Sequence, residues 1–349
     1  MPAFKDLELL PVPDPVAAAV ADLVDRYHRH RDLYRGSDYN EARLRQEFLN
    51  PFFAALGWDM DNRQGYAEPY KEVVHEDTLR VGDTARAPDY CFRLMGQPKF
   101  YVEAKAPRTN IRDDLSPAYQ LRRYGWSAKL PLSVLTDFEE FAIYDCREKP
   151  APTDPPAYAR VGYVTYDQYA DRLAEIYSIF SHDAIPKGFF DRYAEAGRGR
   201  RGTTTVDAAF LAEIERWRDE LARNLALRND ISVADLNFAV QAIIDRLLFL
   251  RIAEDRGLEP ENRLQSTAAA GRNIYPALCG MFHEADHKYN SGLFDFDGDQ
   301  FTTDLQVDDR VLRDIISNLY YPRSPYEFSV IGADILGAVY EQFLARSFA

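Results

Sequence analysis

Two acidic residues and a lysine stand close together in the first third of the chain. Asp89 follows a proline, and thirteen residues separate it from the triplet Glu103-Ala104-Lys105. Carboxylate oxygens are the ligands that Mg²⁺ prefers in proteins. A lysine beside them can orient or deprotonate a water and can offset negative charge on a phosphate. These residue types therefore indicate metal-dependent hydrolysis of a phosphodiester, with Asp89 and Glu103 as metal ligands.

The sequence around these residues predicts a β-hairpin. The runs 87–94 and 100–105 are rich in β-prone side chains, and the Gly-Gln-Pro segment between them is typical of a turn. Glu103 and Lys105 are two positions apart, so they project from one face of their strand. Pairing of the strands would bring Asp89 beside Glu103. An ordinary surface hairpin with an exposed Glu–Lys pair is the alternative for this pattern taken alone.

A helix is predicted over residues 116–129, because Ser followed by Pro is a common helix start. Gln120 and Tyr124 are four positions apart in it and therefore share one helix face. Short apolar runs at 132–136 and 140–144 predict two further strands that flank a turn.

A second helix is predicted upstream, over residues 40–56, where apolar side chains recur at helical spacing. Glu41 falls on this apolar stripe. Glu47 also qualifies by position as an acid from this helix, but it faces away from the stripe, so Glu41 is favoured. An amphipathic helix over residues 16–33 is expected to pack on the same domain as an extra N-terminal element.

The order of these elements resembles the core of the PD-(D/E)xK nuclease superfamily. Asp89, Glu103 and Lys105 match its three named positions, and Gln120 and Tyr124 match its downstream helix motif. The resemblance implies an α/β domain with a mixed central sheet flanked by helices. It also implies catalytic roles for these five residues and Glu41. The implied metal is Mg²⁺, which Mn²⁺ can replace, bound at Asp89, Glu103 and Ala104.

The second half of the chain resembles the helical connector of Type IIG restriction-modification enzymes, in which one chain joins a nuclease to an adenine methyltransferase. Residues 225–257 predict a long, buried helix that ends at a glycine, and the stretches 210–218, 288–294 and 335–344 match the connector too. The methyltransferase signatures of that family are absent, so this chain is expected to be an N-terminal part that lacks the methyltransferase and target-recognition domains. S-adenosylmethionine is expected to act only in the full-length protein.

The charge of the chain is uneven. The net charge is −14, which argues against a general nucleic-acid binder. Residues 99–129 nevertheless carry seven basic side chains against three acids. The expected DNA contacts are arginines in this stretch and in the Gly/Arg segment 197–202, where an exposed, charged linker is the alternative. These candidates are Arg108, Arg122, Arg123, Arg200 and Arg201.

Other features of the sequence predict where the domains end and where in the cell the protein is found. We expect a nuclease domain over residues 1–185, which includes a strand at 159–166, and an all-helical connector over residues 186–349. Three cysteines at no metal-binding spacing favour reduced thiols. No signal peptide and no run of apolar residues long enough for a bilayer is found, so a cytoplasmic protein without a membrane partner is expected.

The combined expectation is a magnesium-dependent endonuclease that cuts double-stranded DNA as the cutting portion of a Type IIG-like enzyme. One such site cuts one strand, so a double-strand break would need a second nuclease copy or two successive nicks. A competing hypothesis is a non-catalytic nuclease fold that serves a methyltransferase-based phage-defence system as a DNA clamp or scaffold. A third is an interaction protein that works through the connector helices.

Overall fold

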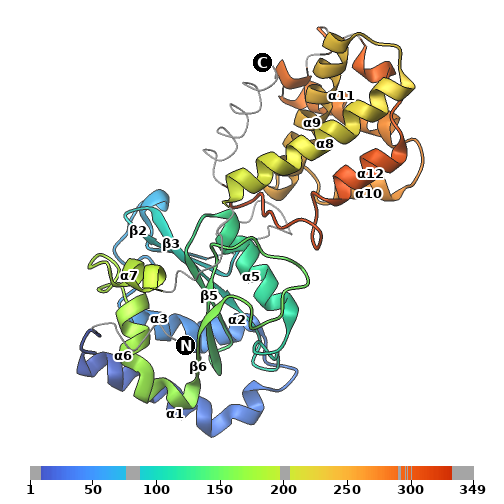
Figure 1. Ribbon diagram of the computed structural model, residues 1–349. Coiled ribbons are helices and arrows are strands. Elements are labelled where there is room, and N and C mark those ends of the chain that lie inside the picture. The colour runs from blue at the N-terminus through green and yellow to red at the C-terminus, as the bar shows by residue number, and fades with distance from the viewer. Residues whose placement is uncertain are drawn as a thin grey trace. The chain divides into compact units, whose positions relative to one another are not determined.

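The computed structural model describes residues 9–331, with the exception of 76–86, 197–204, 290–291, 295, 297 and 300. The described residues divide into two compact units (Figure 1). The first runs to the end of a helix at Ala196, and the second begins at Thr205. None of the described helices is both long and apolar enough to cross a membrane.

The first unit is built on a six-stranded mixed sheet whose strands follow one another in chain order. Neighbouring strands are antiparallel, except that β3 and β4 are parallel. The helix α5 (Leu115–Ser127) makes the crossover that this parallel pair requires. The expectation of an α/β domain with a mixed sheet and flanking helices is confirmed. The strands are β1 (Val73–His75), β2 (Tyr90–Leu94), β3 (Gln97–Ala104), β4 (Leu132–Thr136), β5 (Glu140–Asp145) and β6 (Arg160–Thr165).

Alternating side chains divide the core between the two faces of this sheet. On β3, Phe100 and Val102 enter a large cluster with most of the helices, whereas Leu135 of β4 and Ala142 of β5 pack in a smaller cluster with α5. The helical elements besides α5 are α1 (Asp14–Tyr34), α2 (Glu41–Leu44), η1 (Arg45–Leu49), α3 (Asn50–Ala55), η2 (Glu68–Tyr70), η3 (Tyr166–Gln168), α6 (Tyr169–Phe180) and α7 (Phe189–Ala196).

The predicted β-hairpin is confirmed, with β2 and β3 paired in antiparallel register and Tyr90 opposite Val102. Asp89 directly precedes β2, and Lys105 directly follows β3. The turn between the strands contains Gly96 at φ +79°, a conformation that side chains rarely adopt. A Cβ atom there would also lie 2.8 Å from the carbonyl oxygen of Pro69, so the turn requires glycine.

The predicted helix over residues 40–56 is present, but its middle turn is a π-helix. Pro51 has no N–H group and therefore cannot donate to the carbonyl of Glu47, its partner in a regular helix. The guanidinium of Arg26 on α1 donates to that carbonyl instead. The predicted helices at 16–33 and 116–129 and the strands at 132–136, 140–144 and 159–166 lie within two residues of α1, α5, β4, β5 and β6.

The regular elements of the second unit are all helices among its described residues. The predicted helix over 225–257 begins later than expected, at Val233, because Ser232 accepts a hydrogen bond from the Asp235 N–H and caps a new helix there. The first unit, in turn, continues beyond residue 185, since Phe190 and Tyr193 lie in its core. The helices of the second unit are α8 (Val206–Arg228), α9 (Val233–Asp255), α10 (Arg263–Ala269), α11 (Ile274–Tyr289), η4 (Gly292–Phe294), η5 (Thr302–Asp304) and α12 (Asp309–Ser317).

Candidate active site

The two candidate metal-binding carboxylates meet at the C-terminal end of β3. Asp89 accepts a hydrogen bond of 2.7 Å from the backbone N–H of Ala104, which follows Glu103 directly. Both side chains are buried, with 7% of Asp89 and 3% of Glu103 exposed. The hairpin thus brings Asp89 against the strand that carries Glu103, as the sequence predicted.

Only one of the two carboxylate oxygens of Glu103 has a hydrogen-bond partner among the described residues. One carboxylate oxygen lies 2.7 Å from the Lys105 ammonium, whereas the other, Oε2, is buried without a hydrogen-bond partner. Burial, followed by the negative charge of Asp89, raises the pKa of Glu103 to about 8, although Lys105 opposes this shift. The structure therefore holds a buried carboxylate that lacks a cationic or hydrogen-bonding partner on one side.

Asp89 is held from the opposite side by Arg45, a residue that the sequence reasoning missed. The Arg45 guanidinium lies 2.9 Å from Asp89 Oδ1. Burial still raises the pKa of Asp89, although the Ala104 N–H, Arg45 and Lys105 all lower it. A signal for Arg45 was available, because it lies four residues after Glu41 in the same helical segment and could have been expected to reach the same site.

Lys105 connects the hairpin to α5. Its ammonium lies 3.5 Å from Gln120 Oε1, and Gln120 Nε2 lies 3.4 Å from the Tyr124 hydroxyl. Burial disfavours the ammonium, but the carboxylates of Glu103, Glu41 and Asp89 outweigh this and raise the pKa of Lys105. The structure thus brings Gln120 to the lysine and Tyr124 to Gln120, and Lys105 stays protonated near neutral pH.

The two candidate acids from the first helix differ in their surroundings. The charge of Glu41 acts on the pKa values of Asp89, Glu103 and Lys105, so Glu41 lies within electrostatic reach of the site. Glu47 is exposed and accepts a hydrogen bond of 3.3 Å from the Tyr39 hydroxyl. These positions favour Glu41.

The described arginines that were expected to bind DNA differ in their exposure to solvent. Arg108 is exposed and donates to the carbonyl oxygens of Ser37 and Tyr39 at 3.0 and 3.1 Å, so no carboxylate is bound to its guanidinium in these two contacts. Arg122 and Arg123 are only 1% and 4% exposed, and burial on this scale argues against phosphate contacts by either of them. Arg200 and Arg201 lie outside the described residues.

The inward position of Arg122 has a specific cause. Its guanidinium lies 2.6 Å from the carboxylate of Asp154 and over the ring of Tyr158, at 4.8 Å from the ring centre. Both partners come from the connection between β5 and β6, which closes over α5. A guanidinium that is paired with a carboxylate in this way holds the fold together and is not free to bind a phosphate.

A metal ion at the hairpin would need more than side-chain ligands. No group of three or more His, Cys, Asp or Glu side chains suited to a metal ion occurs in the part of the chain that the structure describes. Asp89 and Glu103 could supply two carboxylates, and the group that Ala104 can offer is its backbone carbonyl oxygen. Mg²⁺ commonly binds through one or two carboxylates and keeps several waters, so this small ligand set fits it.

Comparisons with known proteins identify a relative. No family model matches the chain, and no solved structure matches it. The chain is 38% identical over 328 residues to the type II restriction enzyme and methyltransferase RM.Eco57I of Escherichia coli. The match covers 93% of this chain but 32% of the relative, so the chain spans about one third of the relative's length. Nearly all of the chain is therefore similar to the N-terminal part of a Type IIG restriction-modification enzyme, as its sequence motifs predicted.

Proposed function

We propose that the first unit has a PD-(D/E)xK nuclease fold and hydrolyses phosphodiester bonds of double-stranded DNA with Mg²⁺ as cofactor. The observation that carries this proposal is the unpartnered, buried Oε2 of Glu103 beside the second carboxylate of Asp89. Buried carboxylates in folded proteins are normally paired or coordinate a metal. A divalent cation between these two side chains would supply the missing partner.

Each residue of the site has a role in this proposal. Asp89, Glu103 and the carbonyl oxygen of Ala104 would hold the cation, which neutralises charge on the scissile phosphate and acidifies water. Lys105 stands 2.7 Å from Glu103 and can donate to the attacking water or to a phosphate oxygen. Gln120 orients the lysine, and Tyr124 orients Gln120. Mn²⁺ is expected to replace Mg²⁺, because it also favours carboxylate and water ligands.

The description of the relative supports this proposal. It is described as a restriction enzyme and methyltransferase, and this chain matches its N-terminal part. We therefore infer that the chain supplies the cutting function and that methyl transfer and target recognition reside outside the matched third. S-adenosylmethionine is expected to bind outside it too. A single site cuts one strand, so a double-strand break requires two nuclease units or two successive cuts.

The test is cleavage of supercoiled plasmid in the presence of Mg²⁺, Mn²⁺ or a chelator. We expect nicked or linear DNA with either metal, and its loss in Glu103→Gln and Lys105→Ala. Glu195→Gln is a matched control, because Glu195 is exposed on α7 and makes no hydrogen bond or ion pair with the described residues. Cleavage that persists in both site variants would refute the assigned site. Metal-independent DNA binding without any cleavage would favour a non-catalytic clamp.

A further inference from the structure

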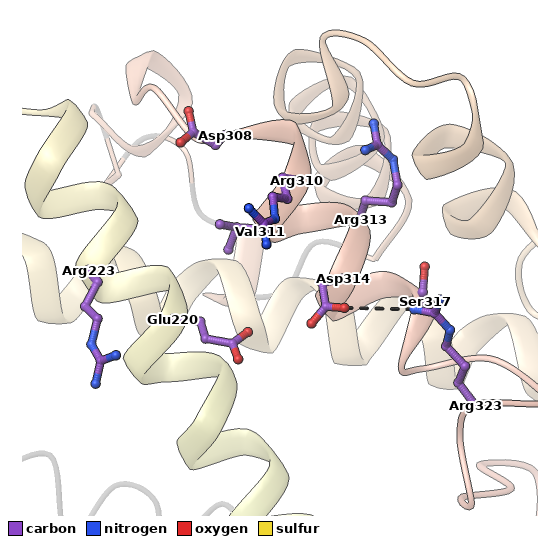
Figure 2. Close-up of a pocket in the computed structure, with 9 residues that line it drawn as sticks. All are labelled: Glu220, Arg223, Asp308, Arg310, Val311, Arg313, Asp314, Ser317 and Arg323. Atoms are coloured by element: carbon purple, nitrogen blue, oxygen red, sulfur yellow. Dashed lines mark ion pairs between the residues drawn. The ribbon is translucent and has the colours of Figure 1, made fainter.

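The helical unit contains a groove between α8 and α12, with a volume of about 870 Å³ (Figure 2). Arg223 projects from α8 on one side and Arg310 projects from the first turn of α12 on the other, with Glu220 between them and Asp314 farther along α12. Four arginines and three acids line the groove. The arginines are Arg223, Arg310, Arg313 and Arg323.

The helical pattern of the sequence places these charges in the groove. Arg216, Glu220 and Arg223 follow one another at four and three residues on α8 and share a face. On α12, Leu312, Ile315 and Ile316 are buried, which leaves Arg310 and Arg313 exposed on the opposite side.

Each acid of the groove already has a cationic partner. Asp308 lies 2.9 Å from Arg228, and Glu220 lies 2.9 Å from Arg216. Asp314 lies 3.6 Å from Arg216 and 3.9 Å from Arg323. Arg216 is shared between the last two acids and Glu213, which it meets at 2.6 Å, so the lining itself carries four arginines against three paired acids.

The remaining arginines of the groove have no carboxylate partner among the described residues. Arg223 and Arg310 make no hydrogen bond or ion pair with any residue that the structure describes. Within the described part of the chain, Arg313 donates to the backbone carbonyl oxygens of Ala268 and Gly271, at 3.4 and 3.1 Å, so its charge has no carboxylate partner in these contacts. Two guanidinium groups without a carboxylate partner among the described residues, those of Arg223 and Arg310, thus line the groove on a chain whose net charge is −14. A guanidinium presents a planar fork of donors that matches the oxygens of a phosphate group.

We propose that this groove binds the phosphodiester backbone of duplex DNA, with Arg223 and Arg310 as the phosphate-binding residues. The proposal rests on the proposed function, since the ligand it names is the DNA substrate proposed for the first unit. The contacts are to phosphate and carry no sequence information. The helical unit thereby adds DNA affinity that the acidic chain as a whole lacks.

The test measures binding of the whole chain to a fluorescein-labelled duplex of about two helical turns, in chelator, by fluorescence anisotropy over a range of salt concentrations. We expect the double variant Arg223→Ala with Arg310→Ala to bind the duplex about tenfold more weakly than the unmodified chain. The slope of log affinity against log salt should also fall by about 0.9 for each lost phosphate contact. Arg272→Ala is the control, because Arg272 is an exposed arginine of the same unit that does not line the groove.

An unchanged affinity and salt slope in the double variant would overturn the proposal. Circular dichroism of the variants checks that both units remain folded, as expected for side chains without partners. Binding of inorganic phosphate, measured by calorimetry, distinguishes a second source of the same chemistry. Loss of phosphate binding with unchanged duplex binding would also overturn the proposal, because the groove would then hold small phosphates.

The two proposals fail in different ways. If Glu103→Gln does not affect plasmid cleavage, the assigned nuclease site is wrong, but reduced duplex binding in the groove variant still supports the groove. If Glu103→Gln abolishes cleavage and the groove variant binds the duplex normally, the nuclease site stands and the groove proposal is refuted.

Discussion

Replacing Glu103 with glutamine tests the electrostatics of the site without any assumption about the reaction. The pKa of Glu103 is raised from 4.5 to about 8, chiefly by burial. Between these pH values the folded chain keeps a proton that the unfolded chain has released. Raising the pH through this window therefore destabilises the folded state, and the loss is complete above about pH 8.

The magnitude follows from the same shift. A difference between 4.5 and about 8, at about 1.4 kcal/mol per pKa unit, sets a ceiling of about 5 kcal/mol on the loss of stability. Asp89 adds to the effect, because burial raises its pKa as well. A neutral amide at position 103 removes the Glu103 contribution, so Glu103→Gln should be more stable than the unmodified chain at about pH 9 and should show a flatter dependence on pH.

The assay is urea unfolding followed by circular dichroism, in chelator, from about pH 5 to about pH 9. Glu195→Gln serves as the control, because it makes the same substitution at an exposed position on α7. Added Mg²⁺ should stabilise the unmodified chain, and more strongly at higher pH, since a ligand must lose its proton to bind metal. Parallel stability curves for the unmodified chain and Glu103→Gln would refute the reasoning.

Further substitutions and one labelling reaction test other parts of the two units. Arg45→Ala removes the guanidinium 2.9 Å from Asp89 and should lower the free energy of unfolding in chelator by about 2 kcal/mol, with part of it restored by Mg²⁺; an unchanged value in urea unfolding would contradict this. Gly125→Ala places a Cβ atom 2.5 Å from Cys146 Sγ and should destabilise the folded chain by about 1–3 kcal/mol. Gly280→Ala, with open space around it in α11, should stabilise the folded chain by up to about 1 kcal/mol. Thermal unfolding of the two variants compares these effects. Burial raises the pKa of Cys146 to about 12, so its thiol should resist a thiol reagent until the chain unfolds, and fast labelling of the folded chain would exclude the buried position.

Local pattern predicted the hairpin well, because the alternation of side chains and the turn at Gly96 act within a short stretch of chain. The adjacency of Asp89 and Glu103 follows from strand pairing alone. Arg45 was missed because its helical spacing from Glu41 places the two residues on one face but does not show that this face meets the hairpin.

Contacts between distant segments escaped prediction for a different reason. Arg122 and Arg123 were expected to face DNA because they lie in a basic stretch, yet both are buried. The partner of Arg122 is Asp154, which lies 32 residues away in a proline-rich connection. No local pattern indicates that this connection folds over α5. Charge along the chain therefore predicts surface potential only where the fold leaves the side chains exposed.

The two units show what a buried carboxylate looks like with and without a structural partner. Asp299 and Glu103 are both 3% exposed. Asp299 accepts hydrogen bonds from Arg246 and from the backbone N–H of Thr302, at 2.7 and 3.0 Å, and its pKa is lowered by these contacts despite burial. Glu103 has one oxygen without a partner, and its pKa is raised to about 8.

A hairpin with a purely structural role would gain stability from a neutral side chain at position 103. An unpaired carboxylate oxygen does not by itself mark a site, because Oδ2 of Asp255, whose other oxygen pairs with Arg251, is also buried without a hydrogen-bond partner. Glu103 differs from Asp255 in that a second buried carboxylate, that of Asp89, lies beside it. The unsatisfied carboxylate at the end of β3, beside Asp89, is therefore better explained by a cation that binds there than by a clamp whose contacts with DNA need no acids at all.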